Sequence, residues 1–211
     1  MYLGRIVAIG MTEEGKTTAM YRVSSRSFPN REAKVIGDAI SIMPRKGFED
    51  DLSKNPYIAY NCVRIAGEYA IATNGSQTDP IVEKIAMGVP VRDALTTCLL
   101  AMDYEKDDYD TPRIVAVVSN KNSVGYLGIV TKDSVIVRAF ELKPGELLYL
   151  STYEKQVPNT HNLDAKFSAK TAEDICQYVI NQGVFADFEH PVTSAVAISA
   201  EDGFDKAIQV V

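Results

Sequence analysis

The chain is organised around one arginine-rich segment, Tyr21-Arg22-Val23-Ser24-Ser25-Arg26-Ser27-Phe28-Pro29-Asn30-Arg31. If its first half is an extended strand, Arg22, Ser24 and Arg26 lie on one face, because successive side chains of a strand alternate. Turn-forming residues follow, so Arg31 can fold back toward the same site. Guanidinium groups beside hydroxyl groups suit the binding of a phosphate or a carboxylate. The segment therefore indicates either an anion site or a solvated basic strand that balances acidic residues elsewhere.

The composition indicates a globular protein that needs a local site for any anionic ligand. The chain has 211 residues, of which 46% are hydrophobic and 24% are charged, as is usual for a soluble globular protein. This length allows one large domain or at most two small ones. The net charge is -6 and the isoelectric point is about 5.0. That balance argues against general nucleic-acid binding, which needs a broad basic surface.

The sequence carries no signal for a membrane span, secretion or a histidine-rich zinc site. No apolar run is long enough to cross a bilayer, and the first residues lack the charged and apolar regions of a signal peptide. The cysteines, Cys62, Cys98 and Cys176, are odd in number and far apart, so a disulfide framework is not expected. His161 and His190 are the only histidines. We therefore expect a cytoplasmic protein.

A phosphate-loop pattern directly precedes the arginine-rich segment. Residues 10–17, Gly-Met-Thr-Glu-Glu-Gly-Lys-Thr, fit G-x-x-x-x-G-K-[ST] after a stretch that predicts a strand. However, Glu13 and Glu14 would lie beside the phosphates. The residues after Lys16 also predict a strand, whereas the motif needs the N-terminus of a helix. We therefore predict a hairpin turn over residues 11–16 and keep a nucleoside-triphosphatase as an alternative.

Strand signals outnumber helix signals. Runs of β-branched and aromatic residues predict strands at residues 2–10, 17–23, 32–43, 57–65, 68–73, 113–119, 124–131, 134–140, 146–152, 192–200 and 207–211. Apolar residues at helical spacing predict helices from residue 79 to a stop at 88, over 90–102 and over 171–182. This order differs from the strand–helix alternation of a doubly wound parallel sheet. It favours an α+β fold of antiparallel sheets with helices layered outside, in a single domain over residues 1–211.

Two polar segments are candidates for a functional site. The acidic run Asp103–Asp110 holds five carboxylates at a predicted helix C-terminus, where they oppose one another and the helix dipole. It is either a solvated loop or a loop from which one carboxylate turns inward and acts as a base. Its spacing does not fit a calcium loop. The turn Thr73-Asn74-Gly75-Ser76 can bring backbone amides close to a ligand.

Four segments together resemble the archaeal type of IMP cyclohydrolase. They are the arginine-rich segment, Asn55–Cys62, Thr73–Asp79, and Ala101–Asp107 followed by Thr111–Arg113. They occur in the same order and at similar spacing, and the resemblance covers nearly the whole chain; it is weakest in the tail after Ser199. Four separate motifs are more specific than any one of them.

The resemblance implies both a fold and a reaction. The implied fold is a four-layer αββα sandwich of mainly antiparallel sheets, like that of the N-terminal-nucleophile hydrolases, with a deep pocket between the sheets. That class uses an N-terminal Cys, Ser or Thr as its nucleophile, whereas here Met1 is followed by Tyr2, so such a nucleophile is not expected. The implied reaction is the last step of de novo purine biosynthesis, which closes a formamido-imidazole-carboxamide ribonucleotide (FAICAR) to IMP and releases water. No cofactor or metal is expected, because both reacting groups lie on one molecule.

The resemblance also implies roles for individual residues. Glu105 is similar to the family's catalytic carboxylate and is expected as the acid–base group, with Arg31 as the cation that stabilises the developing oxyanion. Arg22, Ser24 and Arg26 are expected at the 5′-phosphate. The remaining residues expected in the substrate site are Asn30, Tyr60, Asn61, Asn74, Gly75 and Tyr104, the last of which would position the catalytic carboxylate. The expected partner is a small nucleotide, not nucleic acid or a membrane, and we expect a homo-oligomer.

Two other functions remain open. A hydrolase of linear amides would use Cys62, the one cysteine outside a helical stripe, but its neighbours Tyr60 and Asn61 supply no activating base. A non-enzymatic nucleotide-binding module is the second alternative, because the arginine-rich segment alone would allow binding.

Overall fold

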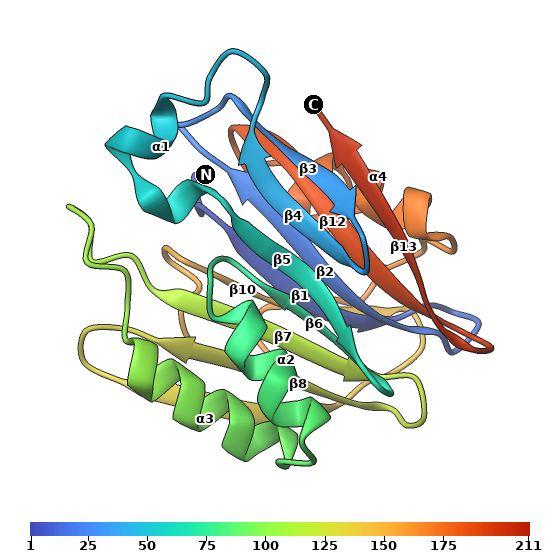
Figure 1. The fold of residues 1–211 in the computed structure, drawn as a ribbon. Coiled ribbons are helices and arrows are strands. Elements are labelled where there is room, and N and C mark those ends of the chain that lie inside the picture. Colours follow the sequence, from blue (N-terminus) through green and yellow to red (C-terminus); the bar gives the residue numbers. More distant parts are fainter.

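Two antiparallel sheets form the body of the molecule, which a computed structural model describes over residues 1–211. The six-stranded sheet has, in spatial order, β11 (Leu163–Asp164), β10 (Glu146–Ser151), β1 (Ile6–Met11), β2 (Thr17–Ser24), β12 (Pro191–Ala200) and β13 (Gly203–Val210). The seven-stranded sheet has β3 (Arg31–Ile36), β4 (Ala39–Pro44), β5 (Tyr60–Ala66), β6 (Tyr69–Thr73), β7 (Arg113–Ser119), β8 (Val124–Val130) and β9 (Val135–Glu141). Most pairings join strands that are neighbours in sequence, so hairpins dominate the topology (Figure 1).

The helices are α1 (Asp51–Lys54), α2 (Thr78–Ala86), α3 (Val91–Met102) and α4 (Ala172–Asn181), with 3-10 turns η1 (Pro56–Ile58) and η2 (Gly183–Phe185). Three of the four helices, α2, α3 and α4, pack on the outer faces of the two sheets, whereas α1 contacts the neighbouring 3-10 turn η1. Ile81 of α2 and Leu95 of α3 pack with Val115 on the outer face of the seven-stranded sheet. Ile175 of α4 packs with Met20 on the outer face of the six-stranded sheet. No helix is long and apolar enough to cross a membrane.

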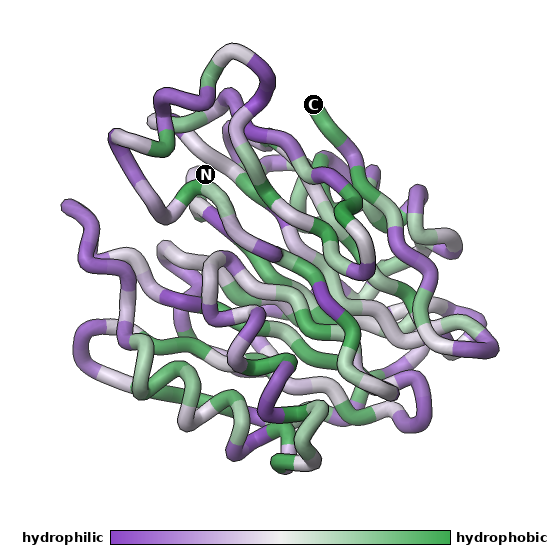
Figure 2. The backbone as a smooth tube through the Cα atoms, in the orientation of Figure 1, coloured by the Kyte–Doolittle hydropathy of each residue, from purple (hydrophilic) through white to green (hydrophobic).

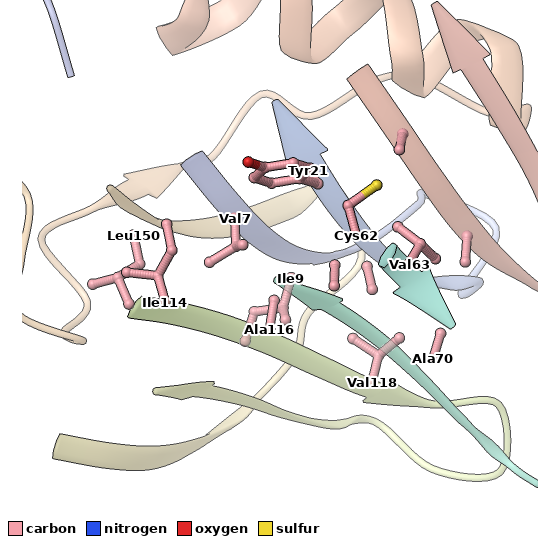
Figure 3. Close-up of a cluster of buried hydrophobic side chains, with 14 of the residues drawn as sticks. Val7, Ile9, Tyr21, Cys62, Val63, Ala70, Ile114, Ala116, Val118 and Leu150 are labelled. Carbon is pink, nitrogen blue, oxygen red and sulfur yellow. The ribbon is translucent and has the colours of Figure 1, made fainter. Parts of the chain in front are cut away.

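The main core lies between the sheets, where strands of both contribute alternate residues. Val7, Tyr21 and Leu150 come from the six-stranded sheet, and Cys62 and Ile114 come from the seven-stranded sheet (Figure 3). Hydrophobic stretches follow the central strands, whereas the connecting turns are largely hydrophilic (Figure 2). Burial of apolar surface on both faces of each sheet therefore holds the layers together.

The structure confirms an α+β arrangement of antiparallel sheets with helices outside, and it corrects one strand. The residues predicted as a single strand over 32–43 form two, β3 and β4, joined at Gly37 and Asp38. Gly37 has a φ of 60°, which a tight turn requires and which glycine adopts without steric cost. The predicted hairpin over residues 11–16 is confirmed by the pairing of β1 with β2. No helix follows that turn, so the phosphate-loop match has no anion-binding helix end.

Candidate active site

One cavity of about 570 Å³ collects residues from five separated parts of the chain. Its lining comes from the segment before β1, the arginine-rich segment, η1, the loop after α3 and the segment after β10. The N-terminus and the α1–η1 region, which border the cavity, lie close together in Figure 1. Polar lining residues include Arg5, Ser24, Ser25, Arg26, Arg31, Glu105, Asp107, Thr111 and Tyr153. The cavity therefore combines cations, a buried carboxylate, hydroxyl groups and aromatic rings.

Glu105 lies in the wall of this cavity and is only 1% exposed. The chain leaves α3 through Asp103, whose φ is 57°, and the Glu105 amide donates to the carbonyl oxygen of Thr111 at 2.8 Å. The predicted inward-turning carboxylate of the acidic run is thus Glu105, while Asp108 and Asp110 are exposed. The backbone conformation of this loop therefore directs the Glu105 side chain inward.

Two arginines face the Glu105 carboxylate. Arg5 donates through Nη2 to Oε2 at 2.7 Å and through Nη1 to Oε1 at 3.2 Å. Arg113 Nη1 lies 3.9 Å from Oε1. Burial raises the pKa of Glu105 above its ordinary value, and both arginines act against that rise. Burial alone would lower the pKa of Arg5, but the carboxylate raises it, so Arg5 remains charged. A carboxyl group that binds its proton more readily than usual suits acid–base chemistry near neutral pH.

Arg31 opens β3 and presents a free donor. Its side chain is 4% exposed, and Nε donates to the carbonyl oxygen of Phe28 at 3.1 Å. Nη1 is buried and has no hydrogen-bond partner. Buried donors in proteins are nearly always paired, so a free guanidinium nitrogen on a residue that lines a cavity is suited to a ligand oxygen.

Ser24 and Arg26 also line the cavity, as expected from the arginine-rich segment. Arg26 is 58% exposed, stacks over the ring of Tyr2 at 4.2 Å and lies 3.4 Å from a carboxylate oxygen of Glu189. The serine-rich turn next to it is stabilised by Ser25 Oγ, which accepts from the amide of Phe28 at 3.0 Å. Arg26 is thus an exposed cation of the cavity lining, whereas Glu105 is buried.

Arg22 was expected at the 5′-phosphate, but its side chain lies outside the cavity lining. The guanidinium is 1% exposed, and Nη1 donates to the carbonyl oxygens of Val179, Ile180 and Phe185 at 3.0 to 3.1 Å. Nη2 donates to a further carbonyl, and Nε donates to Ser24 Oγ at 3.0 Å. Burial lowers the pKa of Arg22 to about 10. Side chains of this strand alternate between its faces as predicted, but the face that carries Arg22 packs against the C-terminal end of α4.

Three other expected substrate residues also lie outside the cavity lining. Asn61 is on the outer face of β5, where it donates to Asp79 of α2 at 2.9 Å. Tyr104 turns toward Lys106, whose Nζ lies 3.4 Å from the ring centroid. Asn30 borders a smaller hollow of about 260 Å³. Strand alternation explains Asn61, since its neighbour Tyr60 faces the inter-sheet core.

Tyr60, Asn74 and Gly75 are buried and do not line the cavity, but Asn74 and Gly75 lie beside lining residues. The Tyr60 hydroxyl lies 2.6 Å from the Tyr21 hydroxyl, and burial raises the pKa of both phenols, so both are neutral at pH 7. Asn74 is fully buried, and its side chain bonds to backbone groups of the segment that leads into β7. A Cβ atom on Gly75 would lie 3.3 Å from Glu105 Oε1 and 2.8 Å from an arginine nitrogen. Glycine at this position therefore lets the backbone pass close to the carboxylate.

Sequence patterns assigned no role to Arg5 or Arg113, the two arginines that lie within 4 Å of the Glu105 carboxylate. Arg113 is held by Gln77 Oε1 at 3.0 Å and by the carbonyl oxygen of Asp103 at 2.9 Å. Arg113 closed one of the motif segments, which is a signal that could have singled it out. A lone arginine before an apolar strand, as at Arg5, carries no such signal.

A thiol nucleophile is contradicted by the position of Cys62. Its side chain is fully buried in the inter-sheet core (Figure 3). Burial raises the pKa of the Cys62 thiol, which disfavours the reactive thiolate. No set of three His, Cys, Asp or Glu side chains is grouped as metal ligands would be.

Comparison with known proteins gives one consistent family. Residues 2–203 match the family model described as IMP cyclohydrolase-like protein. A Methanocella arvoryzae protein named IMP cyclohydrolase is 49% identical over 209 residues, which cover 99% of this chain and 98% of the relative. Proteins of the same name from Methanosphaera stadtmanae and Methanocaldococcus jannaschii are 46% and 44% identical, each over 96% of both chains.

Proposed function

The chain belongs to the IMP cyclohydrolase family, and we propose that its cavity binds FAICAR and closes the pyrimidine ring of IMP with Glu105 and Arg31. The observation that carries this proposal is one arrangement within one cavity. Glu105, whose buried carboxylate is held by Arg5, and Arg31, which has one buried and unpaired nitrogen, both belong to its lining residues. Ring closure needs an acid–base group and a donor for a developing oxyanion.

In the proposed reaction, the carboxamide nitrogen of FAICAR attacks the formyl carbon, and a carbon–nitrogen bond forms. Glu105 accepts the proton that the nitrogen loses, while Arg31 donates a hydrogen bond to the formyl oxygen as it becomes negative. Glu105 returns this proton to the oxygen, which becomes a hydroxyl group. The carbon–oxygen bond then breaks as the formamido nitrogen forms a double bond to the same carbon, and the oxygen leaves as water with the proton that this second nitrogen loses. No net proton is gained or lost, and no external redox partner is needed. The cavity also turns the flexible formamido group toward the carboxamide, which is a positioning task.

We place the 5′-phosphate of the nucleotide beside Arg26, an exposed arginine of the cavity lining. Ser24 and Ser25 belong to the same part of the lining, and guanidinium and hydroxyl donors suit phosphate oxygens. The imidazole ring would then extend toward Glu105. Arg22 has no part in this arrangement because its donors are occupied by backbone carbonyls.

Further features of the family resemblance stay proposals. We propose that residues 1–211 act as a single catalytic domain, and that its two sheets with outer helices correspond to the αββα sandwich of N-terminal-nucleophile hydrolases. The proposed chemistry relies on general acid–base catalysis by Glu105. A homo-oligomeric state and a cytoplasmic location remain predictions.

Incubation of the protein with FAICAR tests this proposal. We expect the absorbance of IMP to rise at a rate proportional to protein concentration, without added metal or nucleotide cofactor, and we expect IMP as the product on chromatography. A parallel calorimetric titration with IMP measures binding alone. Saturable binding of the nucleotides without any turnover would contradict the proposal and identify a binding module instead.

A further inference from the structure

We propose that Arg5 is a positioning residue for this reaction, whose guanidinium holds the Glu105 carboxylate ionised and in one orientation at the cavity wall. The inference rests on the proposed function, because it depends on Glu105 serving as the base. Arg5 would not itself contact the reacting atoms. Its role would be to prepare the carboxylate before the substrate binds.

The backbone of Arg5 is anchored where β1 begins. The Arg5 amide donates to Thr152 Oγ1 at 3.1 Å, and the Thr152 amide donates to the Arg5 carbonyl oxygen at 3.0 Å. The preceding Gly4 has a φ of 68°, and a Cβ atom there would lie 2.3 Å from Thr152 Oγ1 and 2.7 Å from the ring of Tyr153. The chain can therefore reach this position only with glycine before Arg5. A rigid backbone gives the long arginine side chain a fixed origin.

The contact between Arg5 and Glu105 has the geometry of a fork. Both terminal nitrogens donate to the carboxylate, one to each oxygen, at 2.7 and 3.2 Å. Two parallel bonds fix the plane of a carboxylate, which a single lysine nitrogen cannot do. The side chains are 12% and 1% exposed, so water screens this pair much less than it screens a surface pair. The arrangement therefore defines both the charge and the orientation of Glu105.

The two arginines at Glu105, Arg5 and Arg113, differ from the cavity residue Arg31 in the donors that remain available to a ligand. Both terminal nitrogens of Arg5 are bonded to the carboxylate. Arg113 is bonded to a backbone carbonyl and to Gln77, and lies 3.9 Å from Glu105. Only Arg31 has a buried terminal nitrogen without a partner. Arg5 therefore binds the carboxylate of Glu105, whereas Arg31 keeps a donor for a substrate oxygen.

Removal of Arg5 would change the proton affinity of Glu105 in a defined direction. The charged groups that act on Glu105 are Arg5, Arg113 and, from its own loop, Asp107. Asp107 opposes ionisation of Glu105, and Arg113 is more distant than Arg5. Without Arg5, burial would be opposed only by Arg113, so the carboxyl group would bind its proton up to a higher pH. A protonated Glu105 cannot accept the carboxamide proton, so activity would fall at neutral pH and recover as the pH rises.

The test compares Arg5→Ala and Arg5→Lys with the wild type and with Arg92→Ala, which removes an exposed arginine of α3. For Arg5→Ala we expect a loss in kcat/KM of about 100-fold at pH 7. We also expect the acid limb of the pH profile to move up by about one pH unit or more. IMP affinity should change by less than about threefold. Guanidinium chloride at low millimolar concentration should restore part of the activity. Arg5→Lys should show a smaller pH shift because it keeps a charge, and Arg92→Ala should match the wild type.

A measurement on the folded protein without substrate separates this inference from the proposed function. Glutamate labelled with carbon-13 at the carboxyl carbon gives a Glu105 resonance, assigned by its loss in Glu105→Gln. This resonance should titrate at a higher pH in Arg5→Ala or Arg5→Lys than in the wild type. An unshifted titration in a folded variant would overturn the positioning role, whether or not the wild type turns over FAICAR. A wild type without turnover would instead overturn the proposed function.

Discussion

Glu105 and Arg31 are both buried charged residues, but they differ in how their polar atoms are paired. The carboxylate is buried with more than one cation near it, whereas the guanidinium is buried with one terminal nitrogen unpaired. An unpaired buried donor is costly to a folded protein, so its persistence in a cavity wall is best explained by a ligand oxygen. In the proposed reaction that oxygen is the formyl oxygen.

The substitution Arg31→Lys tests this explanation. Lysine keeps the positive charge but loses the planar fork, including the bond from Nε to the Phe28 carbonyl oxygen. We expect kcat to fall by about 100- to 1000-fold with little change in KM, because the lost contact forms mainly in the transition state. Steady-state kinetics with FAICAR measure both constants.

Arg26→Lys is the matched control for that variant. Arg26 is an exposed arginine of the same cavity, and we expect its substitution to raise KM while kcat changes little. A kcat of Arg31→Lys within twofold of the wild type would contradict the oxyanion role.

At this scale, sequence motifs could predict only part of the site. Glu105 and Arg31 belong to segments whose resemblance to a family singled them out, and both line the cavity. Arg5 could not be found in this way, because its partner lies 100 positions away in the chain. The sequence placed Arg22 with Ser24 and Arg26 through strand alternation, which gives faces but does not say what covers each face.

Strand β2 shows how one element serves two purposes. Tyr21 and Val23 enter the inter-sheet core, and Arg22 on the opposite face binds the end of α4 and η2. The C-terminal carbonyl groups of a helix carry partial negative charge. A buried arginine without a carboxylate partner is therefore stabilised by these carbonyl groups. We interpret Arg22 as a structural clamp between β2 and α4.

Arg22→Met tests the clamp. The side chain keeps a similar length but leaves several buried carbonyl oxygens without a donor, so we expect the free energy of unfolding to fall by about 2–4 kcal/mol. Urea denaturation followed by circular dichroism measures this loss. KM for FAICAR should stay within about twofold of the wild type, since Arg22 is outside the cavity. A large rise in KM at unchanged stability would restore Arg22 as a phosphate ligand.

The elements themselves were largely predictable because their signals are local. A run of β-branched residues predicted β7 over residues 113–119, and apolar residues at helical spacing predicted α4. In the structure the Thr171 side chain caps α4 by accepting from the amide of Asp174. The pair β3 and β4 was predicted as one strand because Gly37 and Asp38 interrupt a continuous run only briefly. The two-residue strand β11 is held only by its pairing with β10, so no local signal could reveal it.

The cavity forms only when distant parts of the chain come together in the folded molecule. It joins the segment before β1, the loop after α3 and the segment after β10, which pairing and packing of two sheets bring together. Its lining combines an exposed arginine, Arg26, with a buried carboxylate, Glu105. Both kinds of group are needed by a ligand that carries a phosphate and a reacting ring.

Ring closure in this cavity requires Glu105 as its acid–base group, and Glu105→Gln removes that group alone. The variant keeps the shape of the side chain but cannot accept the carboxamide proton, so we expect IMP formation from FAICAR to fall by about 100- to 10,000-fold. Calorimetry should show IMP affinity within about threefold of the wild type. Asp108→Asn, an exposed neighbour on the same loop, should retain wild-type turnover. A Glu105→Gln protein that still forms IMP at a rate close to that of the wild type would contradict the account.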